Sequence, residues 1–258
     1  MARAAFNHNK IISLTNIILT GLFFCFMFSF CSSREAAYSA EGGVDKMLNN
    51  LHWLGHASFR WDGSKTIYFD PWKLSRRSKK SDFIFITHEH FDHCSLDDIK
   101  LISTKDTVIV ASEAAAKQLE SARPLCKEIK PLLPGDNIEI SGIKVSAVAS
   151  YNINKQFHTK GSHKLGFIVT VDGIKIYDAG DTDNIPEMKN YGCDIALLPV
   201  SGTYVMTADE AVKAALIIKP KVAIPMHYGD IIGTESDAVR FQELLKDKIE
   251  VNILEKEN

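Results

Sequence analysis

Short apolar runs that end in polar, glycine-containing turns recur along the chain after its first fifty residues. Residues 82–87 alternate and are rich in β-branched and aromatic side chains, which is typical of a buried strand. Residues 165–171 and 174–177 flank an Asp-Gly pair, a pattern that predicts a hairpin. Residues 222–225 form another short apolar strand. Because strand and helix signals alternate, the pattern predicts an α/β fold.

Two segments carry the signals of a helix start. Ser95 is placed to cap a helix, with Asp97 and Asp98 in the first turn, where the helix dipole favours carboxylates. Thr207 and Glu210 have the spacing of a capping box. The first of these helices follows a predicted strand almost directly. The residues between them therefore lie at the rim where α/β proteins place their chemistry.

The N-terminal segment is apolar on all sides. Residues 11–31 carry no charge, and Arg3 and Lys10 precede them. The segment reaches the ~20 residues that span a bilayer, and a soluble helix of this kind would have to be buried on every face. We expect residues 1–40 to be a signal peptide or membrane anchor with a short linker, and a lipoprotein leader stays open. The charge before the segment predicts an exported domain outside the cytoplasm.

Composition limits the number of domains and the kinds of partner that we expect for this protein. Residues 41–258 suffice for one compact domain with its own core. The formal net charge of −2 gives no basic surface for nucleic acid, so no nucleic-acid partner is expected. Two of the five cysteines lie in the apolar segment, and the odd number left over does not support a disulfide framework.

A cluster of histidines follows the strand predicted at 82–87. Three histidines and an aspartate lie within six consecutive positions, in a chain with only 9 histidines: His88, His90, Asp92 and His93. Either the loop is merely histidine-rich, or it binds a metal, since neutral imidazole and carboxylate are the ligands that Zn²⁺ selects. The spacing favours the metal site, although the cluster supplies only half of one.

Further ligand-type residues follow other strands. Asp181 lies in "AGDT" after the hairpin, and His227 lies in "PMHYG" after the strand at 222–225. A polar loop upstream carries His158 and His163. Each strand is followed by a ligand-type residue and then by a glycine-containing turn.

These motifs carry a family resemblance. "THEHFDH" matches the HxHxDH signature of the metallo-β-lactamase superfamily, and "AGDT" and "PMHYG" follow in the expected order. Together with "LHWLGHASFRWDGSKTIYFDPW", the chain closely resembles small metal-dependent hydrolases related to N-acyl-phosphatidylethanolamine phospholipase D and L-ascorbate-6-phosphate lactonase over about residues 50–255. The resemblance implies a four-layer αββα sandwich with metals in a cleft at one edge of the two sheets.

The resemblance also implies two divalent metal ions, zinc or manganese. Asp181 would bridge them, which differs from the class B β-lactamases that use a cysteine at the second metal. His158 is preferred to His163 as third ligand of the first metal, because "FHTKG" matches the family and His163 is read as an exposed loop residue. The implied ligands are His88, His90 and His158 for the first metal and Asp92, His93 and His227 for the second.

The implied function is hydrolysis of a phosphodiester, lactone or related ester by a metal-bound hydroxide. Asp92 is the expected catalytic residue, which orients the water and accepts its proton. A non-catalytic metal-binding surface protein of the same fold is the alternative. We expect a small-molecule or lipid-like substrate, and the basic run at 73–80 is either a solvated linker or a collar for an anionic one.

Other residues near the motifs have open roles. His56 either lines the site as a hydrogen-bond donor or is a buried histidine bonded to the backbone. Asp70 ends a strand and is expected to orient a ligand histidine. Tyr228 either polarises a leaving group or is a packed tyrosine. Thr203 and Tyr204 are candidates to face the substrate.

Overall fold

The computed structural model describes residue 1, residue 44 and residues 47–257, and the fold below concerns the last range. Among these described residues, no helix is long and apolar enough to cross a membrane. The apolar segment at 11–31 lies outside the described residues. Its interpretation as a signal peptide or anchor therefore stays a prediction.

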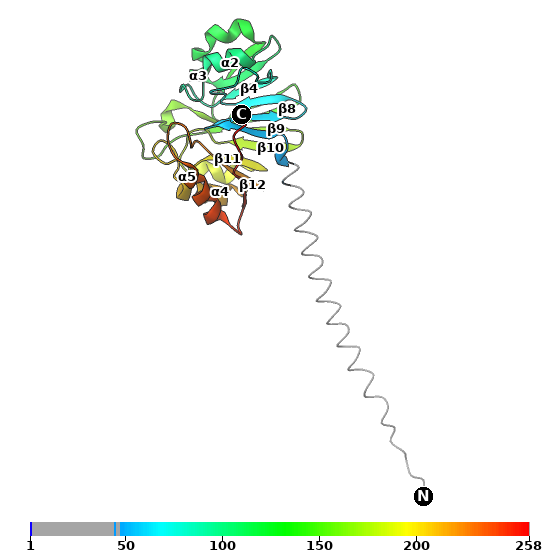
Figure 1. The fold of residues 1–258 in the computed structure, drawn as a ribbon, viewed down its shortest axis with the longest axis vertical. Coiled ribbons are helices and arrows are strands. Elements are labelled where there is room, and N and C mark those ends of the chain that lie inside the picture. The colour runs from blue at the N-terminus through cyan, green and yellow to red at the C-terminus, as the bar shows by residue number, and fades with distance from the viewer. Residues whose placement is uncertain (2–43, 45–46, 258) are drawn as a thin grey trace. The chain divides into compact units, whose positions relative to one another are not determined.

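Two mixed sheets form the centre of the fold (Figure 1). Each combines an antiparallel meander with parallel strands: β1–β3 and β7–β10 pair antiparallel, whereas β3–β6 and β10–β13 pair parallel. The six-stranded sheet contains, in spatial order, β1 (Leu51–Gly55), β2 (Ser58–Asp62), β3 (Thr66–Phe69), β4 (Phe83–Ile86), β5 (Val108–Ser112) and β6 (Glu128–Leu132). The seven-stranded sheet contains β7 (Asn137–Ile140), β8 (Ile143–Ala149), β9 (Leu165–Val171), β10 (Ile174–Asp178), β11 (Ile195–Pro199), β12 (Val222–Met226) and β13 (Glu250–Val251).

Helices cover the outer faces of both sheets. In Figure 1, α2 and α3 lie beyond the first sheet, and α4 and α5 lie beyond the second. The helices are α2 (Leu96–Ile102), α3 (Glu113–Gln118), α4 (Ala208–Ile218) and α5 (Glu235–Leu245), with short 3-10 helices η2 (Glu120–Leu125), η3 (Lys160–Ser162) and η4 (Pro186–Asn190). The predicted four-layer αββα sandwich is confirmed.

The two sheets pack through aromatic side chains on their inner faces. Phe85 on β4 contacts Phe167 on β9 with ring centroids 5.3 Å apart, and Phe69 stacks on Phe85 at 5.5 Å. All three are fully buried, and burying one phenylalanine contributes about 1.5–3 kcal/mol. Leu165 donates its backbone N–H to the Thr87 carbonyl, which joins the end of β4 to the start of β9. This packing fixes the strand ends that carry the site.

The local signals in the sequence correspond to real elements. The strand at 82–87 is β4, the hairpin is β9 and β10, and the strand at 222–225 is β12. Ser95 caps α2 by accepting the Asp98 N–H. The capping box that starts α4 is complete. These predictions are confirmed, because each rested on local hydrogen bonding or on alternation within one strand.

Candidate metal centre

The ligand-type side chains meet at one edge of the two sheets. Three of the four contributing segments are turns that directly follow a strand, and the fourth is the loop between β8 and β9. Parallel strands present their carboxyl ends at the same edge, so residues far apart in sequence converge there. The turn after β4 carries His88, His90, Asp92 and His93, the loop carries His158, and the turns after β10 and β12 carry Asp181 and His227.

The turns at the site are unusually sharp. His56, His158 and His227 have φ angles of 54°, 58° and 60°, in the left-handed region that costs a non-glycine residue about 1–2 kcal/mol. Gly180 has φ 58°, and a Cβ there would lie 2.8 Å from the Leu165 carbonyl oxygen. Glycine is therefore needed directly before Asp181.

A first group of nitrogens comes from His88, His90 and His158. The His90 Nδ1 lies 3.1 Å from the His88 Nε2 and 3.0 Å from the His158 Nε2. Burial lowers the pKa of all three imidazoles, well below the usual value for His88 and to about 4 for His158. The rings are therefore neutral near pH 7, which is the form that binds metals.

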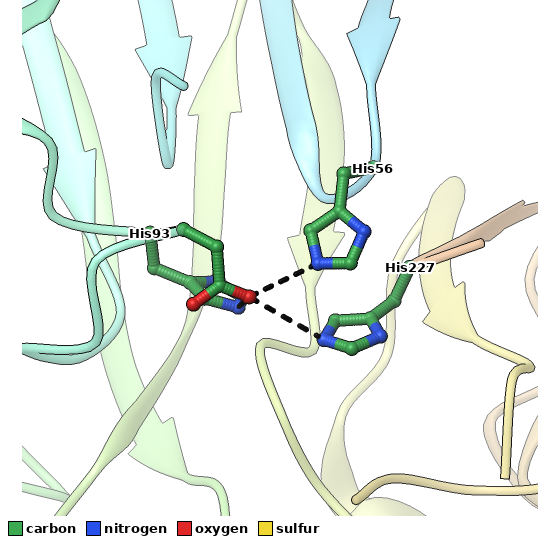
Figure 2. A group of neighbouring side chains, drawn as sticks. His56, His93 and His227 are labelled. Atoms are coloured by element: carbon green, nitrogen blue, oxygen red, sulfur yellow. Dashed lines mark hydrogen bonds and ion pairs between the residues drawn. The ribbon is translucent and has the colours of Figure 1, made fainter. Parts of the chain in front are cut away.

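A second group surrounds the Asp92 carboxylate. Figure 2 shows His56, His93 and His227 around one carboxylate. The Asp92 Oδ2 lies 3.1 Å from the His56 Nε2, 3.5 Å from the His93 Nε2 and 4.0 Å from the His227 Nε2. Burial opposes ionisation of Asp92, but its hydrogen bond to His56 and the nearby His93 imidazole hold the pKa of the carboxyl well below the usual range.

Asp181 lies between the two groups. Its Oδ1 is 3.2 Å from the Nε2 of both His93 and His227. Its Oδ2 faces the other way, 3.8 Å from the His88 Nε2 and 3.7 Å from the His158 Nδ1. One oxygen thus faces each group, as a bridging carboxylate requires.

Several of these buried atoms lack a hydrogen bond. Among the described residues, the His93 Nε2, the Asp181 Oδ1 and the His158 Nδ1 have no hydrogen-bond partner, although the first two lie 3.2 Å apart. Buried polar atoms are nearly always paired, and a bound ion is one of the few explanations for an exception. Imidazole nitrogens and carboxylate oxygens are also the donors that zinc and manganese accept. The residues therefore fit divalent metal ions.

Asp70 fixes the orientation of two histidines. This fully buried carboxylate accepts the His93 Nδ1–H at 2.7 Å and the Thr87 O–H at 2.6 Å. Since the one hydroxyl proton of Thr87 goes to Asp70, the Thr87 oxygen at 2.9 Å must accept the His88 Nδ1–H. In its neutral, metal-binding form each of the two histidines would therefore present an Nε2 lone pair to the site. The orienting role expected for Asp70 agrees with this geometry.

Two of the supporting residues escaped the sequence analysis. The Thr87 hydroxyl links Asp70 to His88. The Ser201 Oγ lies 3.1 Å from the His227 Nδ1. Each follows a buried apolar strand at the same rim as the ligands. That position is the signal that could have identified them.

The remaining predicted residues divide between the site and the periphery. His56 is fully buried and bonds to Asp92, so it belongs to the second group. Tyr228 is buried, stacks on Trp53 at 4.9 Å and does not line the cavity above the ligands. His163 is exposed at the end of η3, whereas His158 faces the first group.

A cavity of about 310 Å³ opens above the ligands. The sequence analysis proposed Tyr204 as a residue that faces the substrate, but it did not identify the other apolar side chains that line this cavity. The lining consists of His90, Phe91, Asp92, Phe157, His158, Asp181, Tyr204, His227 and Ile231.

Known proteins have sequences similar to that of this chain. Residues 50–227 match the family described as the β-lactamase superfamily domain. The UPF0173 metal-dependent hydrolase of Thermoplasma acidophilum is 34% identical over 203 residues, covering 74% of this chain and 88% of that protein. Its counterpart in Thermococcus onnurineus is 33% identical over 219 residues, covering 79% and 95%.

Solved structures share the fold. A crystal structure from Parabacteroides distasonis, described as a candidate metal-dependent hydrolase, has a TM-score of 0.69 and 35% identity, covering 80% of this chain and 93% of that one. The metallo hydrolase Igni18 of Ignicoccus hospitalis has a TM-score of 0.66 at 22% identity, covering 81% and 95%. The chain therefore belongs to the metallo-β-lactamase superfamily, as one of its metal-dependent hydrolases.

Proposed function

We propose that this hydrolase is binuclear and cleaves a phosphodiester, lactone or related ester. The observation that carries the proposal is the Asp181 carboxylate, whose Oδ1 faces His93 and His227 while its Oδ2 faces His88 and His158. A site for one ion would not need two such groups of donors on opposite sides of one carboxylate.

In this proposal each group of side chains holds one ion, zinc or manganese. When bound, two divalent ions lower the pKa of a water molecule to ~7 and stabilise the negative charge that develops on the substrate oxygen. Asp181 would contribute one oxygen to each ion. The first ion would be held by His88, His90 and His158, and the second by Asp92, His93 and His227.

Two observations support a role for Asp92 as general base. Asp92 lines the cavity, and its Oδ2 is hydrogen-bonded to the His56 Nε2 at 3.1 Å. An ionised carboxylate only accepts hydrogen bonds, so His56 must donate and thereby fixes the direction in which Asp92 points. We propose that Asp92 accepts the proton of the attacking water in addition to binding metal.

Asp92→Asn separates these two roles. The variant keeps an oxygen ligand but cannot take a proton, so its rate should stay low at saturating metal by about 10²–10⁴-fold, the usual contribution of a positioned base. Rates are measured against metal concentration, with metal content determined in parallel. Recovery of nearly full turnover with added metal would leave Asp92 as a ligand alone.

The function itself is tested by metal content and hydrolysis together. Domain purified without chelator should hold two divalent ions per chain, determined by elemental mass spectrometry. It should hydrolyse a member of a panel of bis(p-nitrophenyl) phosphate, lactones and simple esters, and chelator should abolish that activity. One ion per chain would contradict the binuclear proposal, and two ions with no activity on the panel would favour the non-catalytic alternative.

A further inference from the structure

Exposed apolar side chains gather at the mouth of the cavity. Phe91, Phe157, Tyr204 and Ile231 line it, yet they are 66%, 50%, 40% and 45% exposed. Single exposed apolar residues are ordinary, but a cluster around a pocket marks a binding surface. These four therefore indicate a ligand that brings apolar surface to the site.

The aromatic rings are arranged in two pairs. Phe157 meets Tyr204 edge-on with centroids 5.8 Å apart, and Phe91 meets Trp72 edge-on at 6.0 Å. Edge-to-face contact is a favourable geometry for aromatic rings and holds each against its neighbour. The pairs come from four separate segments of the chain. The tertiary fold therefore assembles the apolar wall of the cavity, which consists of Phe91, Phe157, Tyr204 and Ile231.

Asn152 connects the two segments of the first pair. Its Nδ2 donates to the backbone carbonyls of Phe157 at 3.0 Å and Tyr204 at 2.6 Å, and the side chain is buried with 4% exposure. Its backbone N–H donates to the His158 carbonyl at 2.6 Å. Asn152 therefore positions the aromatic wall relative to a metal ligand.

The rest of the lining limits the class of ligand. The cavity lining contains no lysine or arginine among the residues that the structure describes, and its polar groups are all proposed metal ligands apart from the Tyr204 hydroxyl. The volume of about 310 Å³ is at the lower end of the ~300–1,000 Å³ of small-molecule sites. That size suits one aromatic ring or a short acyl chain.

We propose that the substrate is a small molecule whose hydrolysable bond is attached to an aromatic ring or short acyl chain, held by Phe91, Phe157 and Tyr204. Asn152 is a positioning residue for this wall. The inference rests on the proposed function only in placing the reacting bond at the ions. The wall itself is independent of the reaction.

A series of hydroxamic acids tests the wall without turnover. Acetohydroxamic, butyrohydroxamic, hexanohydroxamic and benzohydroxamic acids offer the same metal-binding head with a growing apolar tail. The zinc-loaded domain starting at Gly42 is suitable, because relatives 33–34% identical consist almost wholly of the matched region. Titration calorimetry should show the affinity rising about fourfold per methylene group.

Variants assign that rise to the wall. Phe157→Ala and Tyr204→Ala should reduce the gain per methylene to about twofold, while acetohydroxamic acid binds as before. Asn152→Asp, which is isosteric but cannot donate to the two carbonyls, should flatten the series in the same way with unchanged metal content. Leu216→Ala, which removes an exposed side chain of α4, is the matched control and should change nothing.

Three outcomes would overturn the inference. Affinity independent of the tail would mean that the wall does not contact the ligand. Failure to bind even acetohydroxamic acid would remove the metal centre on which the inference rests, and metal content would show this separately. Co-sedimentation with phosphatidylcholine vesicles that Phe157→Ala abolishes, together with a flat series, would make the wall a lipid-surface contact instead.

Discussion

Replacing Asp70 by asparagine should disable ligands of both proposed metals with one atom changed. Asp70 accepts the His93 Nδ1–H and the Thr87 O–H, and Thr87 in turn accepts from His88. Asparagine still accepts the Thr87 backbone N–H through Oδ1, which Asp70 accepts at 2.8 Å. Its Nδ2, however, donates where the carboxylate accepted. His93 must then accept at Nδ1 and carry its proton on Nε2, the atom that faces Asp181.

The same change propagates to His88. Once the Thr87 oxygen accepts from the introduced asparagine, its hydroxyl proton is free to donate to the His88 Nδ1, which moves that histidine's proton to Nε2 as well. Loss of such an orienting partner costs about 10–100-fold in metal affinity, equivalent to about 1.4–2.7 kcal/mol. The free energy of unfolding of the metal-free domain should fall by less than this loss in metal-binding free energy. The reason is that the protonated His93 Nε2 then has the Asp181 Oδ1 as an acceptor 3.2 Å away.

Competition with a fluorescent zinc chelator measures the affinity, and nitrogen chemical shifts of the imidazoles report which nitrogen carries the proton. Asp194→Asn is the matched control. That carboxylate also accepts a backbone N–H, from Lys175 at 2.8 Å, but it lies just before β11, at the end opposite the site. Unchanged zinc affinity in Asp70→Asn, with the His93 proton still on Nδ1, would refute the tautomer argument.

Three further predictions concern separate features. His158→Ala should lower metal content whereas His163→Ala should not, because only His158 faces the first group; equal loss in both would contradict this. Gly180→Ala should destabilise the domain by about 1–3 kcal/mol and reduce metal binding, since its Cβ would lie 2.8 Å from the Leu165 carbonyl; an unchanged melting temperature would count against it. Full-length protein should fractionate with membranes or be exported, and a chain starting at Gly42 should be soluble. Cytoplasmic soluble protein with an intact N-terminus would reject the export proposal.

Sequence reasoning succeeded where the signal was local. The turn after β4 carries four ligand-type side chains within six consecutive positions, and hairpins and helix caps depend on neighbours a few residues away. His56 was left with two roles, because a single buried histidine looks the same in sequence whether its partner is the backbone or a carboxylate 36 positions away. Only the fold shows Asp92 beside it.

The apolar wall could not be predicted for a related reason. Phe157 and Ile231 lie in loops without periodicity, and an apolar residue in a loop is normally read as one that turns inward to pack. Whether it lines a cavity depends on which loops the two sheets bring together. Asn152, which joins two of those loops, is likewise an ordinary polar loop residue until Phe157 and Tyr204 are placed around it.

The left-handed backbone at His56, His158 and His227 also constrains how this site can decay over evolutionary time. If a lineage no longer needed the metals, few residues could replace histidine at these positions, because most side chains are strained in the left-handed conformation. Glycine, asparagine and aspartate tolerate this conformation best. Descendants that have lost the chemistry should therefore show these three residues there in preference to alanine or branched side chains. His88 and His93, which lack the constraint, should diversify more widely, so that the pattern of replacement would itself identify an abandoned active site.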